Sequence, residues 1–150
     1  MKPPKIQDER VREIIQSYST AIDTTSDVNE MWELKNKLNK IKDTLPSSYY
    51  LCYYYLLQAK LYKKFKLMID QCTNPERAIK LPNFTTLIDK CTNLDVMKTI
   101  RSQIAQELKS ASAKDKTMDN IYMAILEKYY FRMYQLSSMQ INILDGIKSY

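Results

Sequence analysis

Hydrophobic residues recur along this chain at helical spacing, and short polar runs separate the recurring stretches. The members of the first stripe are Val11, Ile14, Ile15, Tyr18 and Ile22. This stripe ends at the polar run 23–26, which also offers N-caps for a following helix. Their i, i+3, i+4, i+7 spacing places them on one face of a helix. A second stripe alternates steps of three and four from Met31 to Leu45. Pro46 ends that helix, because the residue before a proline is disfavoured in the α region.

The most unusual stretch is SSYYLCYYYLLQAKLYKKF, residues 47–65, which the spacing predicts as a third helix capped by Ser47 or Ser48 and ending near Cys72. Its second half is amphipathic, with three lysines opposite the apolar face: Lys60, Lys63 and Lys64. Its first half is apolar all round, because the lysine side also carries Tyr49, Tyr53 and Leu56. A helix that is apolar on every side is normally buried within its domain. We therefore expect this helix to be central.

The segment after this helix is expected to be broken. Asn74 and Pro75 have the pattern of an N-cap followed by proline at the first helical position, which opens a short turn to about Lys80. Pro82 is predicted to interrupt it, since proline lacks the backbone N–H that a helix interior uses. A short helix is then expected up to about Cys91.

Two longer helices complete the predicted chain. Thr92 or Asn93 caps the first of them, and a loop at about 109–117 follows it. Thr117 opens the last helix, which we expect to run for about 42 Å. Gly146 is predicted to end it in the left-handed conformation.

Composition supports an all-α fold. The chain has one glycine and five prolines in 150 residues, which fits long helices, because tight hairpin turns and most β architectures need more glycine. A chain of this length is about one domain. We therefore predict a single-domain, all-α bundle over residues 1–150, with five or six helices, two of them long and central, and a flexible segment at 1–7.

One short motif occurs twice. IDQCTN at 69–74 returns as IDKCTN at 88–93, and Ile22-Asp23 precedes a similar polar break. Helical repeat proteins have periods of about 33 to 47 residues and usually three or more copies. Two copies 19 residues apart therefore indicate a reused helix end and cap and not a repeat architecture.

The chain lacks the residue types that most catalytic and metal sites require. It has no histidine and one glycine, which excludes Ser-His-Asp and Cys-His catalysis, Cys/His zinc sites and glycine-rich phosphate loops. Cys52, Cys72 and Cys91 form no C-x-x-C pair. Asp70 and Asp89 are the best-placed carboxylates for acid–base work, but each is more simply a helix-end residue facing water. We therefore expect no enzyme, no cofactor, no metal and no small-molecule substrate.

The charge distribution and the targeting signals indicate what the protein binds and where in the cell it is located. The net charge is +6, and its excess lies in residues 51–100, which carry eight positive and four negative side chains. That excess indicates either an anionic partner or a solvated helix face. The start has no apolar signal region, and the longest charge-free run, 44–59, has 16 residues, fewer than the about 20 that span a bilayer. An odd number of cysteines without a signal indicates reduced thiols, so we expect an intracellular protein, cytoplasmic or nuclear.

Two surface features are the candidate sites. One is the mixed side of the third helix, formed by Tyr49, Tyr53, Leu56, Lys60, Lys63 and Lys64. The other is Phe131, which projects from the otherwise polar side of the last helix. Tyrosine is enriched at binding interfaces because it combines a large area with a polar tip. The competing interpretation is that another helix of the same chain covers Tyr49 and Tyr53.

Three functional classes are compatible with these features. The leading hypothesis is a non-enzymatic protein-binding module (an adaptor, scaffold or regulatory subunit) that binds another protein or itself through this Tyr/Lys-rich surface. The alternative is nucleic-acid binding through the basic patch Lys60–Lys66, with further lysines of the second helix: Lys35, Lys37, Lys40 and Lys42. Phosphate contacts would make such binding fall steeply with salt. A peripheral role on an anionic membrane is the third hypothesis, ranked behind these two.

Overall fold

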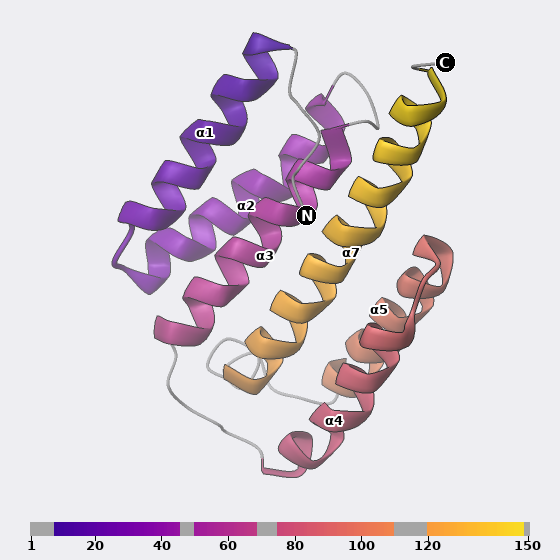
Figure 1. Cartoon of the computed structure of the whole chain (residues 1–150). Coiled ribbons are helices and arrows are strands. Elements are labelled where there is room, and N and C mark those ends of the chain that lie inside the picture. Colours follow the sequence, from indigo (N-terminus) through magenta and orange to yellow (C-terminus); the bar gives the residue numbers. More distant parts are fainter. Residues whose placement is uncertain (1–7, 46–49, 69–74, 110–119, 149–150) are drawn as a thin grey trace.

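Helices pack around one central pair in this protein (Figure 1). The structure is a computed structural model that describes residues 8–45, 50–68, 75–109 and 120–148, with side chains described at 8–45, 50–68, 83–106 and 123–139. Within these ranges there are six helices and no strand, which confirms the predicted all-α fold. The helices are α1 Glu9–Thr24, α2 Val28–Thr44, α3 Leu51–Met68, α4 Pro75–Lys90, α5 Leu94–Lys109 and α7 Asn120–Lys148.

Side-chain caps begin three of these helices. Asp8 accepts hydrogen bonds from two backbone N–H groups at the start of α1, and Asp27 accepts one at the start of α2. At α5, Asn93, one of the two caps predicted there, accepts from the N–H of Asp95 at 2.7 Å. Such caps satisfy N–H groups that have no partner within the helix. Helix α1 ends within the polar run 23–26, as expected, but the cap of α2 is Asp27, the residue after that run.

Helices α3 and α7 form the centre, as predicted, and they make the most extensive contact of any described helix pair. They are antiparallel: Tyr55, near the start of α3, stacks on Tyr130, whereas Lys66, near its end, pairs with the earlier residue Glu127 of α7. Helices α1 and α2 pack on α3, and α4 and α5 pack on α7 (Figure 1). Ten residues of α3 are buried, because three helices contact it. This explains why its first half is apolar on every side.

Two predicted breaks are absent from the helices. The prediction that Pro82 interrupts its segment was wrong, because α4 is one helix from Pro75 to Lys90. A proline inside a helix costs about 3 kcal/mol, and the packing of α4 against α7 and α5, with Ile88 fully buried, offsets this cost. The prediction that Gly146 ends the last helix was also wrong, because α7 continues to Lys148. Glycine costs a helix interior only about 1 kcal/mol.

Several predicted boundaries lie outside the described residues. These are the cap at Ser47 or Ser48, the end of the third helix near Cys72, and the start of the last helix at Thr117. Most of the predicted loop at 109–117 lies there too, although Lys109 itself belongs to α5.

The arrangement α1–α2–α3 recurs as α4–α5–α7. Helices α1 and α4 begin at residues 9 and 75, and α2 and α5 begin at 28 and 94, so both pairs are offset by 66 positions. Buried residues obey the same offset, since Ile22 corresponds to Ile88 and Met31 to Met97. At 88–93 the interpretation as a helix end and cap is confirmed, because Ile88 is buried near the end of α4 and Asn93 caps α5. The motif also lies in a repeated unit, which the sequence interpretation did not anticipate. Its counterpart is Ile22-Asp23, and not the copy at 69–74, which lies outside the described residues.

The ion pairs repeat as well. In the first half Asp23 of α1 pairs with Lys60 of α3 at 2.8 Å, and in the second half Asp89 of α4 pairs with Lys128 of α7 at 3.0 Å. Lys60 and Lys128 are 68 positions apart, so α3 and α7 correspond with nearly the same offset as the other helices. The described chain therefore consists of two similar three-helix units.

Tyr62 and Tyr130 mark the relation between the two units. They are also 68 positions apart, and their rings stack on each other with centroids 5.5 Å apart and an interplanar angle of 1°. Equivalent residues of two antiparallel helices can meet in this way only near an axis of twofold rotation. The two units are thus related by an approximate twofold axis that passes through the α3/α7 contact.

Candidate functional site

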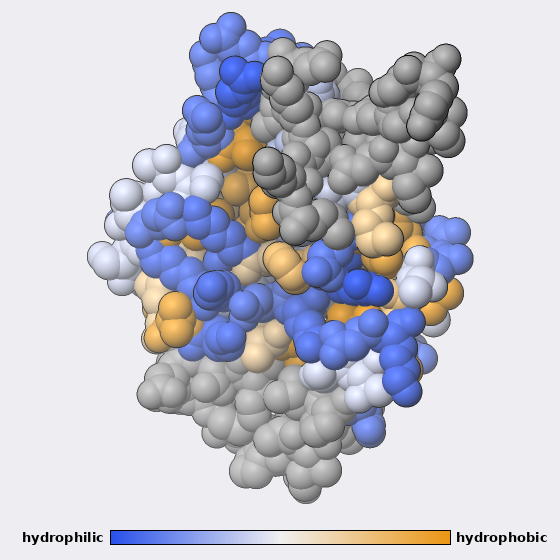
Figure 2. All heavy atoms as spheres, in the orientation of Figure 1, coloured by the Kyte–Doolittle hydropathy of each residue, from blue (hydrophilic) through white to orange (hydrophobic). Residues whose placement is uncertain are grey.

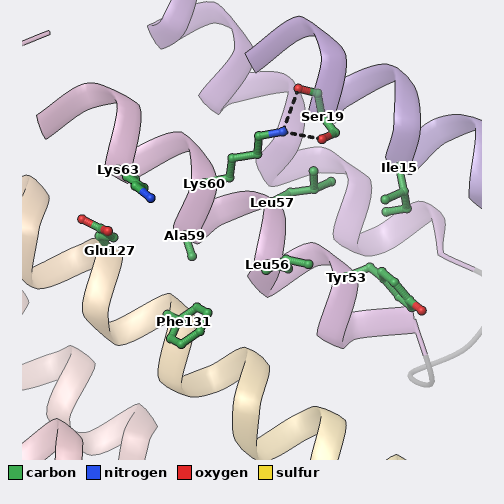
Figure 3. A pocket seen from close by; sticks show the side chains of 10 residues that line it. All are labelled: Ile15, Ser19, Tyr53, Leu56, Leu57, Ala59, Lys60, Lys63, Glu127 and Phe131. Carbon is green, nitrogen blue, oxygen red and sulfur yellow. Dashed lines mark hydrogen bonds between the residues drawn. The ribbon is translucent and has the colours of Figure 1, made fainter. Parts of the chain in front are cut away.

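A groove of about 550 Å³ lies where α1, α3 and α7 meet. Helix α3 forms its floor, and α1 and α7 form its two sides (Figure 3). The lining residues are Ile15 and Ser19 of α1, Tyr53, Leu56, Leu57, Ala59, Lys60 and Lys63 of α3, and Glu127 and Phe131 of α7. On the face of the molecule that carries these helices, apolar residues surface between hydrophilic ones (Figure 2).

Two lysines of α3 hold the α1 side of the groove in place. The ammonium group of Lys60 donates to Ser19 Oγ at 2.6 Å (Figure 3). It also pairs with the carboxylate of Asp23 at 2.8 Å. One turn later, Lys64 donates to the backbone carbonyl oxygens of Ile22 and Asp23. A cation is favourable at this place, because the C-terminal end of a helix carries unpaired carbonyls and the negative end of its dipole.

The α7 side of the groove presents an aromatic ring and a carboxylate. Phe131 is 46% exposed, and its ring lies 5.8 Å from that of Tyr134. Glu127, one turn earlier, pairs with Lys66 of α3 at 2.8 Å. Phe131 is thus an exposed anchor on the side of an apolar groove, and the nearby carboxylate is already neutralised.

Lys63 carries the uncompensated charge of the groove. It is exposed and lies beside Glu127 at one end of the groove (Figure 3). In the described part of the chain no carboxylate forms an ion pair with it, whereas Lys60 and Lys66 pair with Asp23 and Glu127. The groove therefore combines a largely apolar lining with one positive charge, at one end, that has no ion-pair partner among the described residues.

Five of the seven predicted site residues come together in this groove: Tyr53, Leu56, Lys60, Lys63 and Phe131. Lys64 does not line it, because its ammonium group is bound to the end of α1. Tyr49 lies outside the described residues. Tyr53 is only 6% exposed, so for this residue the interpretation that other helices of the chain cover it is correct. Tyr53 belongs to the floor of the groove and not to its free surface.

Sequence reasoning did not place Ile15, Ser19 and Leu57 in the site. Ile15 and Leu57 have the helical spacing of core residues, and Leu57 is indeed buried. Their position beside the groove depends on how closely α1 approaches α3, which no local pattern reports. The sequence did contain one indication of this approach. The lysines on the basic side of α3 could form ion pairs with Asp23 at the polar end of α1.

The groove contains no recognisable catalytic constellation. Its one carboxylate, Glu127, is held by Lys66, and the hydroxyl of Ser19 is held by Lys60. Cys52 is a buried thiol that forms no disulfide, and burial raises the pKa of this thiol to about 12. At neutral pH it is therefore protonated and a poor nucleophile. The described side chains include no cluster of three or more cysteines or carboxylates that could hold a metal ion.

Comparison with known proteins identifies no relative of this chain. No protein-family model, curated protein or solved structure matches the chain. Among the helices at 8–45, 50–68, 75–109 and 120–148, none is both long enough and apolar enough to cross a bilayer.

Proposed function

We propose that this protein is a non-enzymatic helical protein-binding module, an adaptor, scaffold or regulatory subunit, and that the groove between α1, α3 and α7 is its binding site. The observation that carries this proposal is Phe131, a half-exposed aromatic side chain on the side of an apolar groove and close to the free charge of Lys63. Aromatic anchors seated at pockets supply much of the binding energy of protein interfaces. The odd number of cysteines supports an intracellular setting for this role.

The lining of the groove suits a protein better than a small substrate. Most of it is aliphatic or aromatic, and two of its polar side chains, Ser19 and Glu127, already bind lysines of α3. Small-molecule sites orient their ligands with a few convergent polar groups, whereas here Lys63 is the one charged lining group without an ion-pair partner among the described side chains. A protein surface, by contrast, gains affinity mainly from buried apolar area and one or two charge pairs.

The alternative of nucleic-acid binding has less support from the lysines of α3. Lys60, Lys64 and Lys66 bind groups of the chain itself. Nucleic-acid affinity comes largely from several cations that each neutralise a phosphate. Within the described part of the patch, Lys63 is the one lysine with neither an ion-pair partner nor a carbonyl partner. The same consideration applies to an anionic membrane surface.

A photo-crosslinker placed in the groove tests the proposed function. A photoreactive phenylalanine analogue at position 131 should capture one protein species in cell extract, and the crosslinked peptide should map to a single segment of that species. The matched control carries the analogue at Leu67 of α3, which is 73% exposed but does not line the groove. Equal capture at both positions, or capture of nucleic acid in place of protein, would overturn the proposal.

A further inference from the structure

We infer that the partner segment in this groove is an amphipathic α-helix with an acidic residue beside its apolar stripe. The inference rests on the proposed function and specifies the chemistry of the partner. Three properties of the groove support it: its length, the state of its polar groups and its unpaired charge.

The length of the floor fits about three turns of a helix. Tyr53, Leu57, Lys60 and Lys63 follow each other on one side of α3 at steps of four, three and three residues. At 1.5 Å per residue the floor is about 15 Å long. Two helices of the chain, α1 and α7, lie along this floor (Figure 3). A third rod of similar length can lie between them and use apolar residues at positions i, i+3 or i+4, and i+7 as anchors.

The polar groups of the groove favour a helix over an extended segment. The three lining helices bond their backbone groups internally, the hydroxyl of Ser19 is occupied by Lys60, and Glu127 is occupied by Lys66. An extended peptide would therefore place N–H and C=O groups against apolar side chains without partners. Each such group opposes binding when it is buried unpaired, because it loses its hydrogen bonds to water without replacement. A helix satisfies its own backbone, so it avoids this cost.

The positive charge of Lys63 indicates that the partner helix carries a negative charge at this place. Lys60 and Lys66 are paired with carboxylates of the chain, whereas Lys63 is exposed and, in the described part, unpaired. Lys63 lies at one end of the floor, within the same groove as Phe131. An Asp or Glu one turn beyond the apolar residue that meets Phe131 can reach this ammonium group. A basic residue at that place would meet a like charge next to an apolar surface, which opposes binding.

Selection from a library of displayed peptides tests this inference. Randomised peptides of about 16 residues, displayed on phage, are selected against the full chain and counter-selected against its Phe131→Asp variant. Two further exposed positions supply matched controls outside the groove: Leu67→Asp for the apolar change and Lys37→Glu for the charge change. Circular dichroism confirms that every variant keeps the helical content of the parent.

The expected product is a set of peptides with apolar residues at i, i+3 or i+4, and i+7 and an Asp or Glu in the next turn. Synthesised with a fluorescent label, such a peptide should bind about tenfold or more weakly to Phe131→Asp and to Lys63→Glu. It should bind unchanged to Leu67→Asp and Lys37→Glu. A peptide with lysine in place of the acid should prefer Lys63→Glu over the parent protein.

Three outcomes would overturn the inference, and they separate it from the proposed function. Peptides that require Phe131 but are proline-rich, extended or basic would show that the groove binds protein of another chemistry, so the proposed function would stand. If peptides are recovered only when the counter-selection is omitted, and they bind Phe131→Asp and Lys63→Glu as tightly as the parent, both the inference and the proposed function fail. Concentration-dependent dimers in sedimentation, lost on Phe131→Asp, would identify a second copy as the occupant and would also refute a partner helix.

Discussion

Arg132 donates two hydrogen bonds to the backbone carbonyl oxygen of Cys91, from Nε at 3.0 Å and from Nη2 at 2.8 Å. Cys91 follows the last residue of α4, so α7 holds the end of that helix. In the other half of the chain Lys64 of α3 holds the end of α1 through the carbonyls of Ile22 and Asp23. Lys64 and Arg132 are 68 positions apart. Each half of the protein thus attaches the C-terminal end of its first helix to its central helix with a cation.

Replacing Arg132 should therefore weaken the docking of α4. We expect Arg132→Met to lower the free energy of unfolding by about 1.5–3 kcal/mol, because hydrogen bonds that involve a charged group contribute about that much. Arg132→Lys should lose less, since a cation remains near the helix end although the two-bond geometry is lost. Urea unfolding followed by circular dichroism measures both values, provided the m-value is unchanged. Parent-like stability of Arg132→Met would contradict the attachment.

The stacked pair on the approximate twofold axis should be energetically coupled. A double-mutant cycle with Tyr62→Leu and Tyr130→Leu should give a coupling free energy of about 0.5–1.5 kcal/mol, the range for aromatic pairs. Tyr18 of α1 provides the control, because no ring contact joins it to Tyr130 among the described residues. Tyr18→Leu and Tyr130→Leu should be additive. A cycle for Tyr62 and Tyr130 that is additive as well would argue against the stacked arrangement.

Substitutions in the groove should differ in their effect on stability, because some lining residues belong to the core and others are exposed for binding. Leu57 is buried, so Leu57→Ala should cost about 2–5 kcal/mol of stability. Phe131 is half-exposed and touches Tyr134, so Phe131→Ala should cost no more than about 1.5 kcal/mol. Chemical denaturation of both variants checks this difference. If Phe131→Ala is as destabilising as Leu57→Ala, Phe131 is a core residue and the proposed binding site fails.

Stability should fall at alkaline pH, partly because of Cys52. Burial raises the pKa of this thiol from 9.0 to about 12. The folded state therefore retains a proton that the unfolded state releases, so this contribution to stability is complete below about pH 9 and is lost as the pH rises through about 12. In that window the free energy of unfolding should fall by up to about 1.4 kcal/mol per pH unit through this group alone.

Comparison of Cys52→Ala with the parent isolates that contribution. Burial also raises the pKa of Tyr54, Tyr55 and Tyr129, which act with the same sign, are present in both proteins and cancel in the difference. The pKa of Tyr134 is raised by burial and by the charge of Cys52, so the difference reports Cys52 together with its effect on Tyr134. Urea unfolding at several pH values between about 9 and 11 should show a shallower decline for Cys52→Ala. Identical pH slopes would show that the thiol is not protected in the folded state.

The proline inside α4 offers a test of helix continuity. Pro82→Ala should raise the free energy of unfolding by about 1–3 kcal/mol, because alanine restores one backbone hydrogen bond in the helix interior. Pro75→Ala is the matched control: this proline is the first residue of α4, where an N–H has no helical partner, so little change is expected. Thermal or urea unfolding distinguishes the two variants. A destabilised Pro82→Ala would indicate that the chain is not a regular helix at this point.

Local patterns were sufficient for the helices themselves. The stripe of α1, the stop before Pro46 and the cap at Asn93 each depend on residues within one or two turns, and the structure agrees with all three. Pro82 and Gly146 were misread because their penalties are local and small, about 1–3 kcal/mol, whereas packing of a whole helix supplies more. The central place of α3 was predictable because a helix with apolar residues on every side has to be covered.

The site was predictable only in part. Exposure of Phe131 and Lys63 followed from their places on the polar sides of their helices, and both line the groove. The roles of Lys60 and Lys64 did not follow, because their partners, at Ser19 to Asp23, are about 40 positions away in the chain. The duplication of the three-helix unit was also hidden, since few residue identities repeat at the offset of 66 while the burial pattern does.

By itself, the amino-acid sequence determined that the chain is helical, where most of its helices begin and end, and which helix is central, because periodicity and capping act over a few residues. Only the tertiary structure decided that the two halves are related by an approximate twofold axis and that α1 and α7 enclose a groove over α3. It also decided that, of the four lysines from 60 to 66, Lys63 is the one left without an ion pair or a carbonyl partner in the described part of the chain. The physical reason is that a lysine becomes compensated when a carboxylate or helix end from a different helix approaches it, and the packing of helices sets that approach.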